Sequence, residues 1–360
     1  MSGVFDKIKK SVFGEKMPEK AMMKVTMLGA RGVGKTSVIT SMYNNTNVAV
    51  SDTKLHIAAE EGTKIILQKK LNDLKQMFLA NNGAGDMVQP GIAGDNMVSI
   101  FEFTFGLNTE KINIGLELRD FPGEYLIREA ETVKEYIKES SALLIAVDTP
   151  HMMECDGRYN EGKNRVSLLT QFFKETLNSE SDEKLIMLIP LKCEKYYHDG
   201  KIDEVTNKVK EVYRELLTFL RDRDNDNGMK GKFACVIAPI LTAGEIVFER
   251  FEGTDGRVTE VVDSTGNVVP AKVTYRYLRP GAKYSPQFCE QPLLYLLSFI
   301  SKLYLRMKDE KSSAGLIVKL KKLFELTPQT NQMLMEIQKM SNKKNDNVSG
   351  YVTCFGRGKI

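Results

Sequence analysis

The octapeptide GARGVGKT, residues 29–36, constrains the fold of this chain more than any other feature. It matches the pattern G-x-x-x-x-G-K-[ST], with Gly29, Gly34, Lys35 and Thr36 at the defining positions. An apolar run precedes it and a stretch typical of a helix follows, which is the order of strand, loop and helix that the motif requires. The chain is therefore expected to contain a phosphate-binding loop (P-loop) within an α/β fold.

The residue types in this loop suit a bound nucleoside triphosphate. Glycines let successive backbone N–H groups turn inward around the β-phosphate. Lys35 should reach the β- and γ-phosphate oxygens, and the hydroxyl of Thr36 should coordinate Mg²⁺. The nucleotide-binding residues predicted from this stretch are Gly29, Arg31, Gly32, Val33, Gly34, Lys35, Thr36 and Ser37.

Apolar runs alternate with helix-like segments along the rest of the chain. Apolar runs predict buried strands at 21–29, 141–148, 184–190 and 232–241, and helical periodicity predicts helices at about 161–177, 202–220 and 291–307. Two alternating segments, 97–105 and 111–120, predict an antiparallel hairpin. This order predicts a P-loop NTPase three-layer αβα sandwich, with a mainly parallel six-stranded sheet, one antiparallel edge strand and two insertions.

The expected P-loop domain covers residues 21–308, with insertions at about 45–96 and 246–286. Residues 1–20 form an amphipathic segment that could contact a membrane surface or a protein partner, or pack on the domain. Residues 309–360 are expected to form a basic C-terminal helix and tail. Their segment AGLIVKLKKLFEL could be a packed helix or a membrane anchor.

The composition excludes several function classes. The formal net charge of +4 is too small to argue for nucleic-acid binding, and no nucleic acid is expected. No apolar run approaches the ~20 residues of a membrane span, so no transmembrane segment is expected. Five scattered cysteines without CxxC spacing indicate reduced thiols and a cytoplasmic protein.

A second motif, D-x-x-G, begins at Asp120 and ends at Gly123, directly after the predicted hairpin. With the P-loop and the order of the strands, it makes residues 22–308 resemble the translation-factor and Ras-like (TRAFAC) class of P-loop GTPases. The resemblance implies that Asp120 holds Mg²⁺ together with Thr36. It also implies that the amide of Gly123 contacts the γ-phosphate and reports its presence.

The resemblance also places the base-reading loop. Where that class has N-K-x-D after a buried strand, this chain has LKCE, so Lys192 keeps the lysine whose stem stacks on guanine. Glu194 replaces the aspartate that pairs with the guanine N1 and N2 hydrogens, and Leu191 replaces the asparagine. A carboxylate there still prefers guanine, because adenine offers no paired donors. The amide of Ala243 would face the guanine oxygen.

The departures themselves form a pattern. The stretches LKCEKYY, DFPGEY and CEQPLLYLL, with the long insertion after the first helix, resemble the bacterial double-GTPase family. That resemblance implies a role in bacterial conflict or antiviral defence. It also implies a protein partner, either a second GTPase or an effector, that binds through the insertions.

Catalytic roles are predicted for Lys35, Gly123 and Glu124. Glu124 stands where Ras-like enzymes have a water-orienting glutamine, and it could equally stabilise a helix N-terminus. The candidates to place positive charge on the transferring phosphoryl group are Arg31, Arg119 and Arg128. The candidates for the hydroxyl of the first switch segment are Ser99 and Thr104.

The sequence therefore favours a Mg²⁺-dependent molecular switch that binds GTP and GDP and hydrolyses GTP slowly without a partner. Two alternatives remain open at this point: a nucleotide-binding pseudo-GTPase scaffold, and a P-loop ATPase or kinase.

Overall fold

The computed structural model describes residues 22–78, 87–88, 97–107, 113–178, 181–226, 232–254, 256–263, 266–309, 328–345 and 348–360. The predicted N-terminal segment 1–20 and the basic segment AGLIVKLKKLFEL lie outside them, as does the loop directly before Met97.

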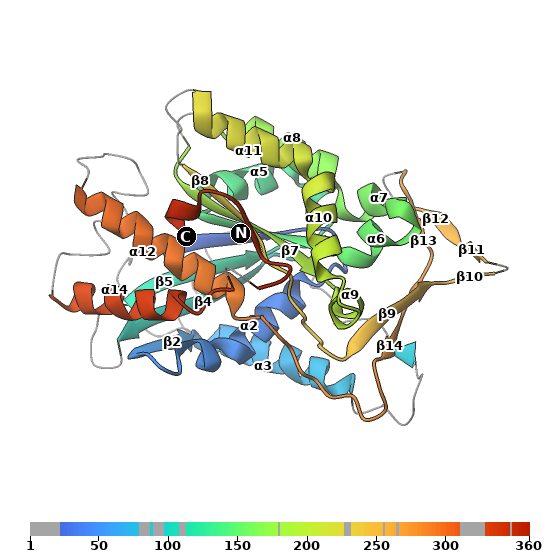
Figure 1. The fold of residues 1–360 in the computed structure, drawn as a ribbon, viewed down its shortest axis with the longest axis horizontal. Helices are drawn as coiled ribbons and strands as arrows, with labels where there is room; N and C mark the ends of the chain where they lie inside the picture. Colours follow the sequence, from blue (N-terminus) through green and yellow to red (C-terminus); the bar gives the residue numbers. More distant parts are fainter. Residues whose placement is uncertain are drawn as a thin grey trace, which may run out of the picture.

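An eight-stranded sheet forms the middle layer (Figure 1). In spatial order its strands are β15 (Val352–Phe355), β8 (Phe233–Ile237), β7 (Lys184–Leu191), β6 (Ala142–Asp148), β1 (Met22–Leu28), β5 (Asn113–Asp120), β4 (Ser99–Leu107) and β2 (Leu55–Ala59). The five from β8 to β5 are parallel, whereas β4, β2 and β15 are antiparallel to their neighbours.

The central strands are buried on both faces, and their alternate side chains enter two different cores. In β6, Leu144 and Ala146 join the core on one face, while Leu143 and Ile145 join the core on the other. Successive strand residues point to opposite faces, so a strand between two helical layers must be apolar at every position. All seven residues of β6 are buried.

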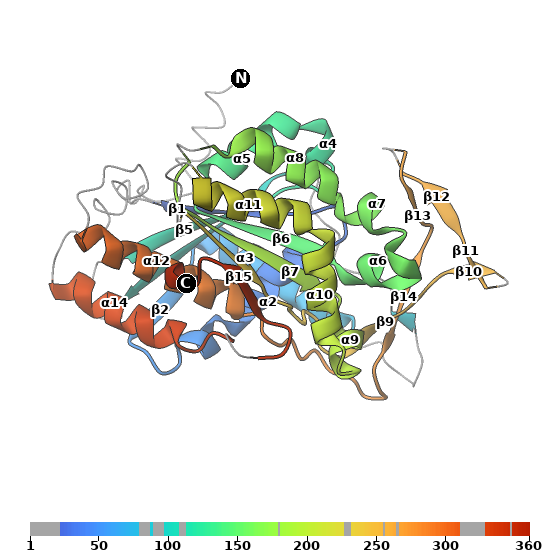
Figure 2. The same cartoon turned by 45° about the horizontal axis from the view of Figure 1, so that its top comes forward.

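Helices cover both faces (Figures 1 and 2). One layer contains α2 (Lys35–Val50), α3 (Glu61–Gln76), α12 (Gln291–Asp309) and α14 (Pro328–Ser341). The other contains α4 (Tyr125–Arg128), α5 (Ala130–Glu139), α8 (Val166–Thr176), α10 (Ile202–Val212) and α11 (Arg214–Asp226). Short helices follow β6 and β7 or close the chain; they are α6 (Thr149–Met153), η1 (Glu154–Gly157), α7 (Asn160–Asn164), α9 (Glu194–His198) and η2 (Arg357–Lys359).

This architecture confirms the predicted fold class, but the sheet has eight strands rather than six and antiparallel strands at both edges. The two additional strands are β2, within the expected first insertion, and β15, within the expected tail. They are five and four residues long, too short to show a clear period in the sequence. Pairing with β4 and β8 defines them.

The second insertion forms small sheets of its own. Its strands are β9 (Ile246–Phe251), β10 (Gly253–Thr254), β11 (Arg257–Val258), β12 (Glu260–Val262), β13 (Val268–Pro270) and β14 (Val273–Tyr277), and β14 also pairs with β3 (Met87–Val88). The hairpins β10–β11 and β12–β13 project from the body (Figure 2). Phe78, which follows α3, joins Phe248, Phe251 and Tyr277 in a third core, so the two insertions pack on each other.

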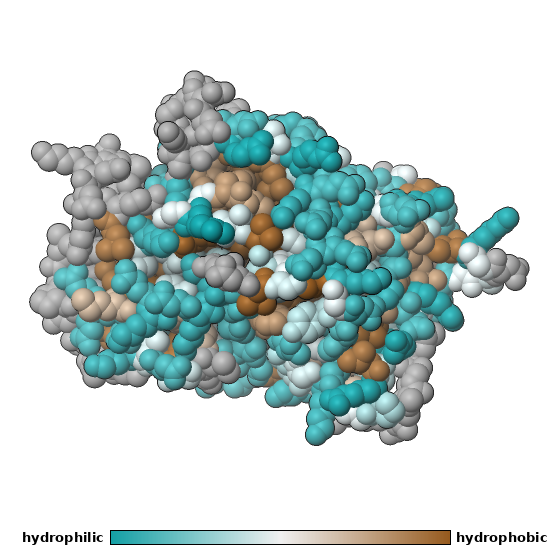
Figure 3. Space-filling model, viewed as in Figure 1, coloured by the Kyte–Doolittle hydropathy of each residue, from teal (hydrophilic) through white to brown (hydrophobic). Residues whose placement is uncertain are grey.

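The surface in the view of Figure 3 is mostly hydrophilic, with small hydrophobic areas. Within the described part of the chain, no helix combines the length and the apolar character needed to cross a bilayer.

Candidate nucleotide-binding site

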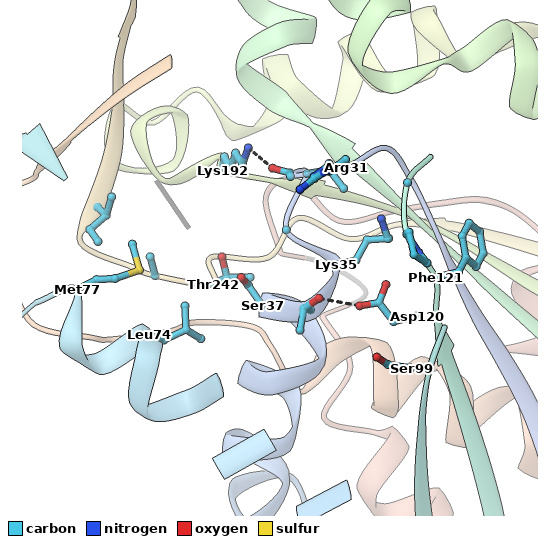
Figure 4. Close-up of a pocket in the computed structure, with 18 of the residues that line it drawn as sticks. Arg31, Lys35, Ser37, Leu74, Met77, Ser99, Asp120, Phe121, Lys192 and Thr242 are labelled. Atoms are coloured by element: carbon cyan, nitrogen blue, oxygen red, sulfur yellow. Dashed lines mark hydrogen bonds between the residues drawn. The ribbon is translucent and has the colours of Figure 1, made fainter. Parts of the chain in front are cut away.

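A cavity of about 240 Å³ opens at the carboxyl ends of the parallel strands. In α/β sheets of this kind, ligands bind at that edge. P-loop residues 31–37, Asp120 and residues 121–124 line one part of it. Lys192, Glu194, Thr242 and Ala243 line another part, the base end, where the sequence predicts that a base binds. In the view of Figure 4, Leu74 and Met77 lie on one side and Lys35 and Asp120 on the other, with Ser37 and Thr242 between them.

The P-loop connects β1 to α2 and needs glycine where its backbone turns. Gly32 and Gly34 have φ angles of 70° and 113°, which side chains rarely allow. Gly123 approaches the loop so closely that an added Cβ would lie 1.9 Å from the nitrogen of Arg31. The D-x-x-G segment therefore packs directly on the P-loop.

Lys35 is buried in the loop, and its ammonium donates to the carbonyl oxygens of Gly29 at 2.7 Å and Ala30 at 3.1 Å. Burial lowers the pKa of Lys35, and the negative charge of Asp120 opposes this effect. To hold a phosphate, Lys35 would exchange these carbonyl contacts for phosphate oxygens, which would also compensate its burial.

Thr36 and Asp120 meet although they are far apart in the sequence. The Thr36 hydroxyl, in the first turn of α2, donates to Oδ2 of Asp120 at 2.7 Å (dashed line at Asp120 in Figure 4). A hydroxyl and a carboxylate are the hard oxygen ligands that suit Mg²⁺. Ser99 pairs with Asp120 across the hairpin and lines the cavity, whereas Thr104 is farther along β4 and does not line it.

Glu124 is engaged by Arg31. The Arg31 Nη1 lies 2.7 Å from Oε1 of Glu124, and both residues line the cavity. Partial burial acts to raise the pKa of Glu124, but the hydrogen bond and the positive charge of Arg31 outweigh it and lower this pKa. Glu124 makes no side-chain capping hydrogen bond to α4. The alternative that Glu124 stabilises the N-terminus of this helix is therefore not supported by a capping bond.

The three arginine candidates separate clearly. Arg31 lines the cavity and is largely exposed. Asp120 faces the cavity, and its strand neighbour Arg119 points away because successive strand residues face opposite sides. Arg119 pairs instead with Glu117 and Glu139. Arg128 is exposed on α4 and does not line the cavity. Among these three, only Arg31 borders the cavity.

Lys192 links the base end of the cavity to the P-loop. Its ammonium donates to the carbonyl of Gly32 and to Oδ2 of Asp148, each at 2.7 Å. Burial acts to lower the pKa of Lys192, but the negative charge of Asp148 outweighs it and raises this pKa. Lys192 has a φ of 57°, a strained conformation for a lysine that these contacts hold in place.

Glu194 and Ala243, the two residues predicted to contact guanine, lie beside each other. The amide of Ala243 donates to Oε1 of Glu194 at 3.2 Å, and Glu194 is only 3% exposed. Burial raises the pKa of Glu194, while backbone amides oppose this. The carboxylate and the amide that a guanine would contact therefore bond to each other.

Sequence reasoning missed the group behind this end of the cavity. Asp148, the last residue of β6, is fully buried and contacts Nδ1 of His151 at 2.6 Å as well as Lys192. Burial acts to raise the pKa of Asp148, but His151 and Lys192 outweigh it and hold this pKa well below its usual range. The available signal was a charged residue ending the apolar run SALLIAVD. Lys163, near the P-loop, carried no signal.

Both insertions contribute cavity walls, which the sequence did not predict. Leu74 and Met77 come from the first insertion, and Ile246 and Tyr275 come from the second. The Lys192 ammonium lies 5.7 Å from the centre of the Tyr275 ring. The insertions thus surround the base end with apolar surface.

No protein-family model matches this sequence, and no curated protein matches it. Three solved structures that are similar to it are 12% identical. The match to the signal recognition particle receptor SRb-GTP/SRX complex from Chaetomium thermophilum covers 62% of this chain and 92% of that chain, with a TM-score of 0.34.

The other two are matched over less than half of their own length. The S. cerevisiae Ski7 GTPase-like domain bound to GTP has a TM-score of 0.36, with 61% of this chain and 42% of that chain covered. Methanosarcina barkeri Roco2 RocCORdC bound to GDP has a TM-score of 0.27, with 65% and 47% covered.

Proposed function

We propose that this protein binds GTP with Mg²⁺ and hydrolyses it to GDP and phosphate as a molecular switch. One observation carries the proposal: a single cavity joins the P-loop, the Thr36–Asp120 pair and the Glu194–Ala243 pair. A triphosphate, its metal and a base each need one of these three parts.

The polarity of the Glu194–Ala243 pair supports guanine. Glu194 offers an acceptor and the amide of Ala243 offers a donor. Guanine presents N1–H and N2–H donors beside an oxygen acceptor, so it could replace their mutual hydrogen bond with one bond to each. Adenine presents an acceptor at N1, which would face the carboxylate. An adenine-specific ATPase is therefore the weaker reading.

At the P-loop, we assign each residue a proposed task. Lys35 would neutralise the β- and γ-phosphate oxygens, and Thr36 and Asp120 would hold Mg²⁺, which supplies further charge neutralisation. The backbone of Gly123 lies against the P-loop, where it can respond to a γ-phosphate. Glu124 would orient the attacking water once it leaves Arg31.

The Arg31–Glu124 ion pair also supports a second candidate function. It ties the charge donor and the water-orienting group to each other. A protein that keeps this pair with nucleotide bound would turn over slowly and serve as a nucleotide-holding scaffold. A partner that separates the pair would speed hydrolysis, because both groups would then be available to the γ-phosphate.

We further propose a cytoplasmic setting and a protein partner, a second GTPase or an effector, that binds through the insertions. The projecting hairpins β10–β11 and β12–β13 would be accessible to it. The resemblance of LKCEKYY, DFPGEY and CEQPLLYLL to the bacterial double-GTPase family suggests a defence role.

The first test measures the affinity for GTP and ATP with Mg²⁺, using the wild type and Glu194→Ala. Glu211→Ala, at an exposed glutamate on α10, is the matched control. Tight GTP binding that Glu194→Ala weakens by on the order of tenfold, with ATP binding unaffected, would support guanine recognition. Equal or stronger ATP binding, indifferent to Glu194, would refute the GTPase proposal.

A further inference from the structure

Lys163 contacts the P-loop from outside the sequence motifs. It lies on the short helix α7, and its ammonium donates to the carbonyl oxygen of Arg31 at 2.7 Å. A Cβ added to Gly32 would lie 3.6 Å from the same ammonium. Lys163 therefore lies directly behind the peptide bond that joins Arg31 to Gly32.

Two other lysines hold the neighbouring carbonyls. Lys35 takes those of Gly29 and Ala30, and Lys192 takes that of Gly32. With Lys163 on residue 31, the carbonyls of four consecutive residues, 29 to 32, each accept a hydrogen bond from a lysine ammonium. Lys163 is the member that no nucleotide-binding motif includes.

Peptide geometry converts this contact into an effect on the cavity. In a trans peptide, the C=O and N–H groups point in opposite directions. Lys163 fixes the carbonyl of Arg31 on the outer side, so the N–H of Gly32 is directed to the opposite side, and Gly32 lines the cavity. Inward N–H groups are what a P-loop uses to hold phosphate.

The position of Lys163 is well determined by its neighbours. The side chain of Asn164 accepts from the backbone nitrogen of Asp148 at 2.7 Å and donates to its carbonyl oxygen at 3.2 Å. Gly162 packs on the second insertion, where an added Cβ would lie 2.8 Å from the side chain of Val269. The end of β6 and the β12–β13 hairpin therefore hold α7 in place.

The electrostatics around Lys163 favour an anion. Burial lowers the pKa of Lys163 to about 8, and the positive charges of Lys192, Lys35 and Arg165 act in the same direction, while Asp148 opposes them. Several cations are therefore gathered behind one loop. A polyphosphate in the cavity would relieve their mutual repulsion and raise this pKa.

We propose that Lys163 is a positioning residue for phosphate: it holds the peptide between Arg31 and Gly32 with its N–H toward a bound polyphosphate and adds a positive charge behind it. This inference deepens the proposed function. It requires that the cavity bind a polyphosphate of any kind. Only the statement that this ligand carries guanine rests on the proposed function.

The test uses inorganic tripolyphosphate and Mg²⁺–GTP as ligands in titration calorimetry of the full chain. The variants are Lys163→Met, Lys163→Arg and the control Lys208→Met, at a lysine that is on α10 and outside the cavity. Lys163→Met should raise the dissociation constants of both ligands about tenfold, and Lys163→Arg should restore most of the affinity because it keeps the charge and a donor. Lys208→Met should bind as the wild type does.

Proton linkage at pH 8 separates positioning by a charged group from a merely structural role. Because its pKa is lowered to about 8, part of the Lys163 population is unprotonated at pH 8, and a bound polyphosphate would raise the protonated fraction. The wild type should therefore take up more protons on binding than Lys163→Met, as measured in buffers of different ionisation enthalpy. Equal uptake, or unchanged affinity in Lys163→Met, would overturn the inference.

The outcomes also separate the two proposals. A wild type that binds tripolyphosphate and prefers ATP, with both the affinity and the proton uptake lost in Lys163→Met, sinks the GTPase proposal and keeps this inference. GTP binding that Lys163→Met leaves unchanged sinks this inference alone. A wild type that binds no polyphosphate sinks both.

Discussion

At the scale of single residues, Asp148 stabilises the base end of the cavity through its ion pair with Lys192. It is fully buried and pairs with Lys192, which in turn holds the P-loop at Gly32. Removing one member of a buried ion pair leaves the other charge without compensation, which is more costly than the pair itself is stabilising. Lys192 would then lose the contact that supports its strained backbone.

We predict that Asp148→Asn destabilises the protein by about 3 kcal/mol in urea unfolding at pH 7. The double variant Asp148→Asn/Lys192→Met should be more stable than Asp148→Asn, because it removes the uncompensated ammonium. Equal stability of the single variant and the wild type would contradict this account of the pair.

The same residue predicts a pH dependence. The pKa of Asp148 is lowered in the folded protein, so the unfolded chain takes up its proton first as the pH falls. The stabilisation is complete above the ordinary carboxyl pKa and is lost as the pH falls through the lowered one. Asp148→Asn should therefore show a flatter loss of stability with acid than the wild type.

At the scale of elements, β15 covers an edge that would otherwise be open. It pairs with β8, whose chain continues to Thr242 and Ala243 at the base end of the cavity. Tyr351, just before β15, donates its hydroxyl to the carbonyl of Pro239 at 2.6 Å. Residues 351–355 thus support the strand that leads to Ala243, whose amide is proposed to contact the base.

We predict that removing residues 350–360 lowers the melting temperature by on the order of 5 °C and promotes self-association. The reason is that β8 would become an exposed edge with unpaired backbone groups. Calorimetry and sedimentation would measure the two effects. A truncated chain that sediments and melts like the wild type would show that β15 contributes little.

At the scale of the whole molecule, the two insertions act together on the cavity. Phe78 of the first insertion lies 6.0 Å from the ring centres of Tyr277 and Tyr284 of the second, and the Tyr277 hydroxyl donates to the carbonyl of Met77. The cavity residues of both insertions therefore form one connected wall; they are Leu74, Met77, Ile246 and Tyr275.

We predict that Phe78→Ala speeds the release of a fluorescent GDP analogue by about tenfold, because losing the aromatic contacts loosens this wall. Val262→Ala, at an exposed position in the second insertion, should leave release unchanged. Stopped-flow fluorescence would measure both rates. Unchanged release from Phe78→Ala, in a protein that still melts cooperatively, would show that the insertions do not restrain the nucleotide.

The sequence by itself determined the P-loop, the hairpin, the D-x-x-G segment and the order of the buried strands. Each of these is a contiguous motif or a long apolar period, so local chemistry is enough to specify it. The resemblance to P-loop GTPases implied that Thr36 and Asp120 act together, and the structure brings them within a hydrogen bond.

Only the tertiary structure decided the rest. The strands β2 and β15 are too short to carry a period, and pairing with β4 and β8 makes them strands. Lys163 and Asp148 gain their roles from packing, because a lone charged residue has no local pattern until the fold sets a partner beside it. The joint wall of the insertions likewise depends on contacts between segments about 200 residues apart, which no local period in the sequence encodes.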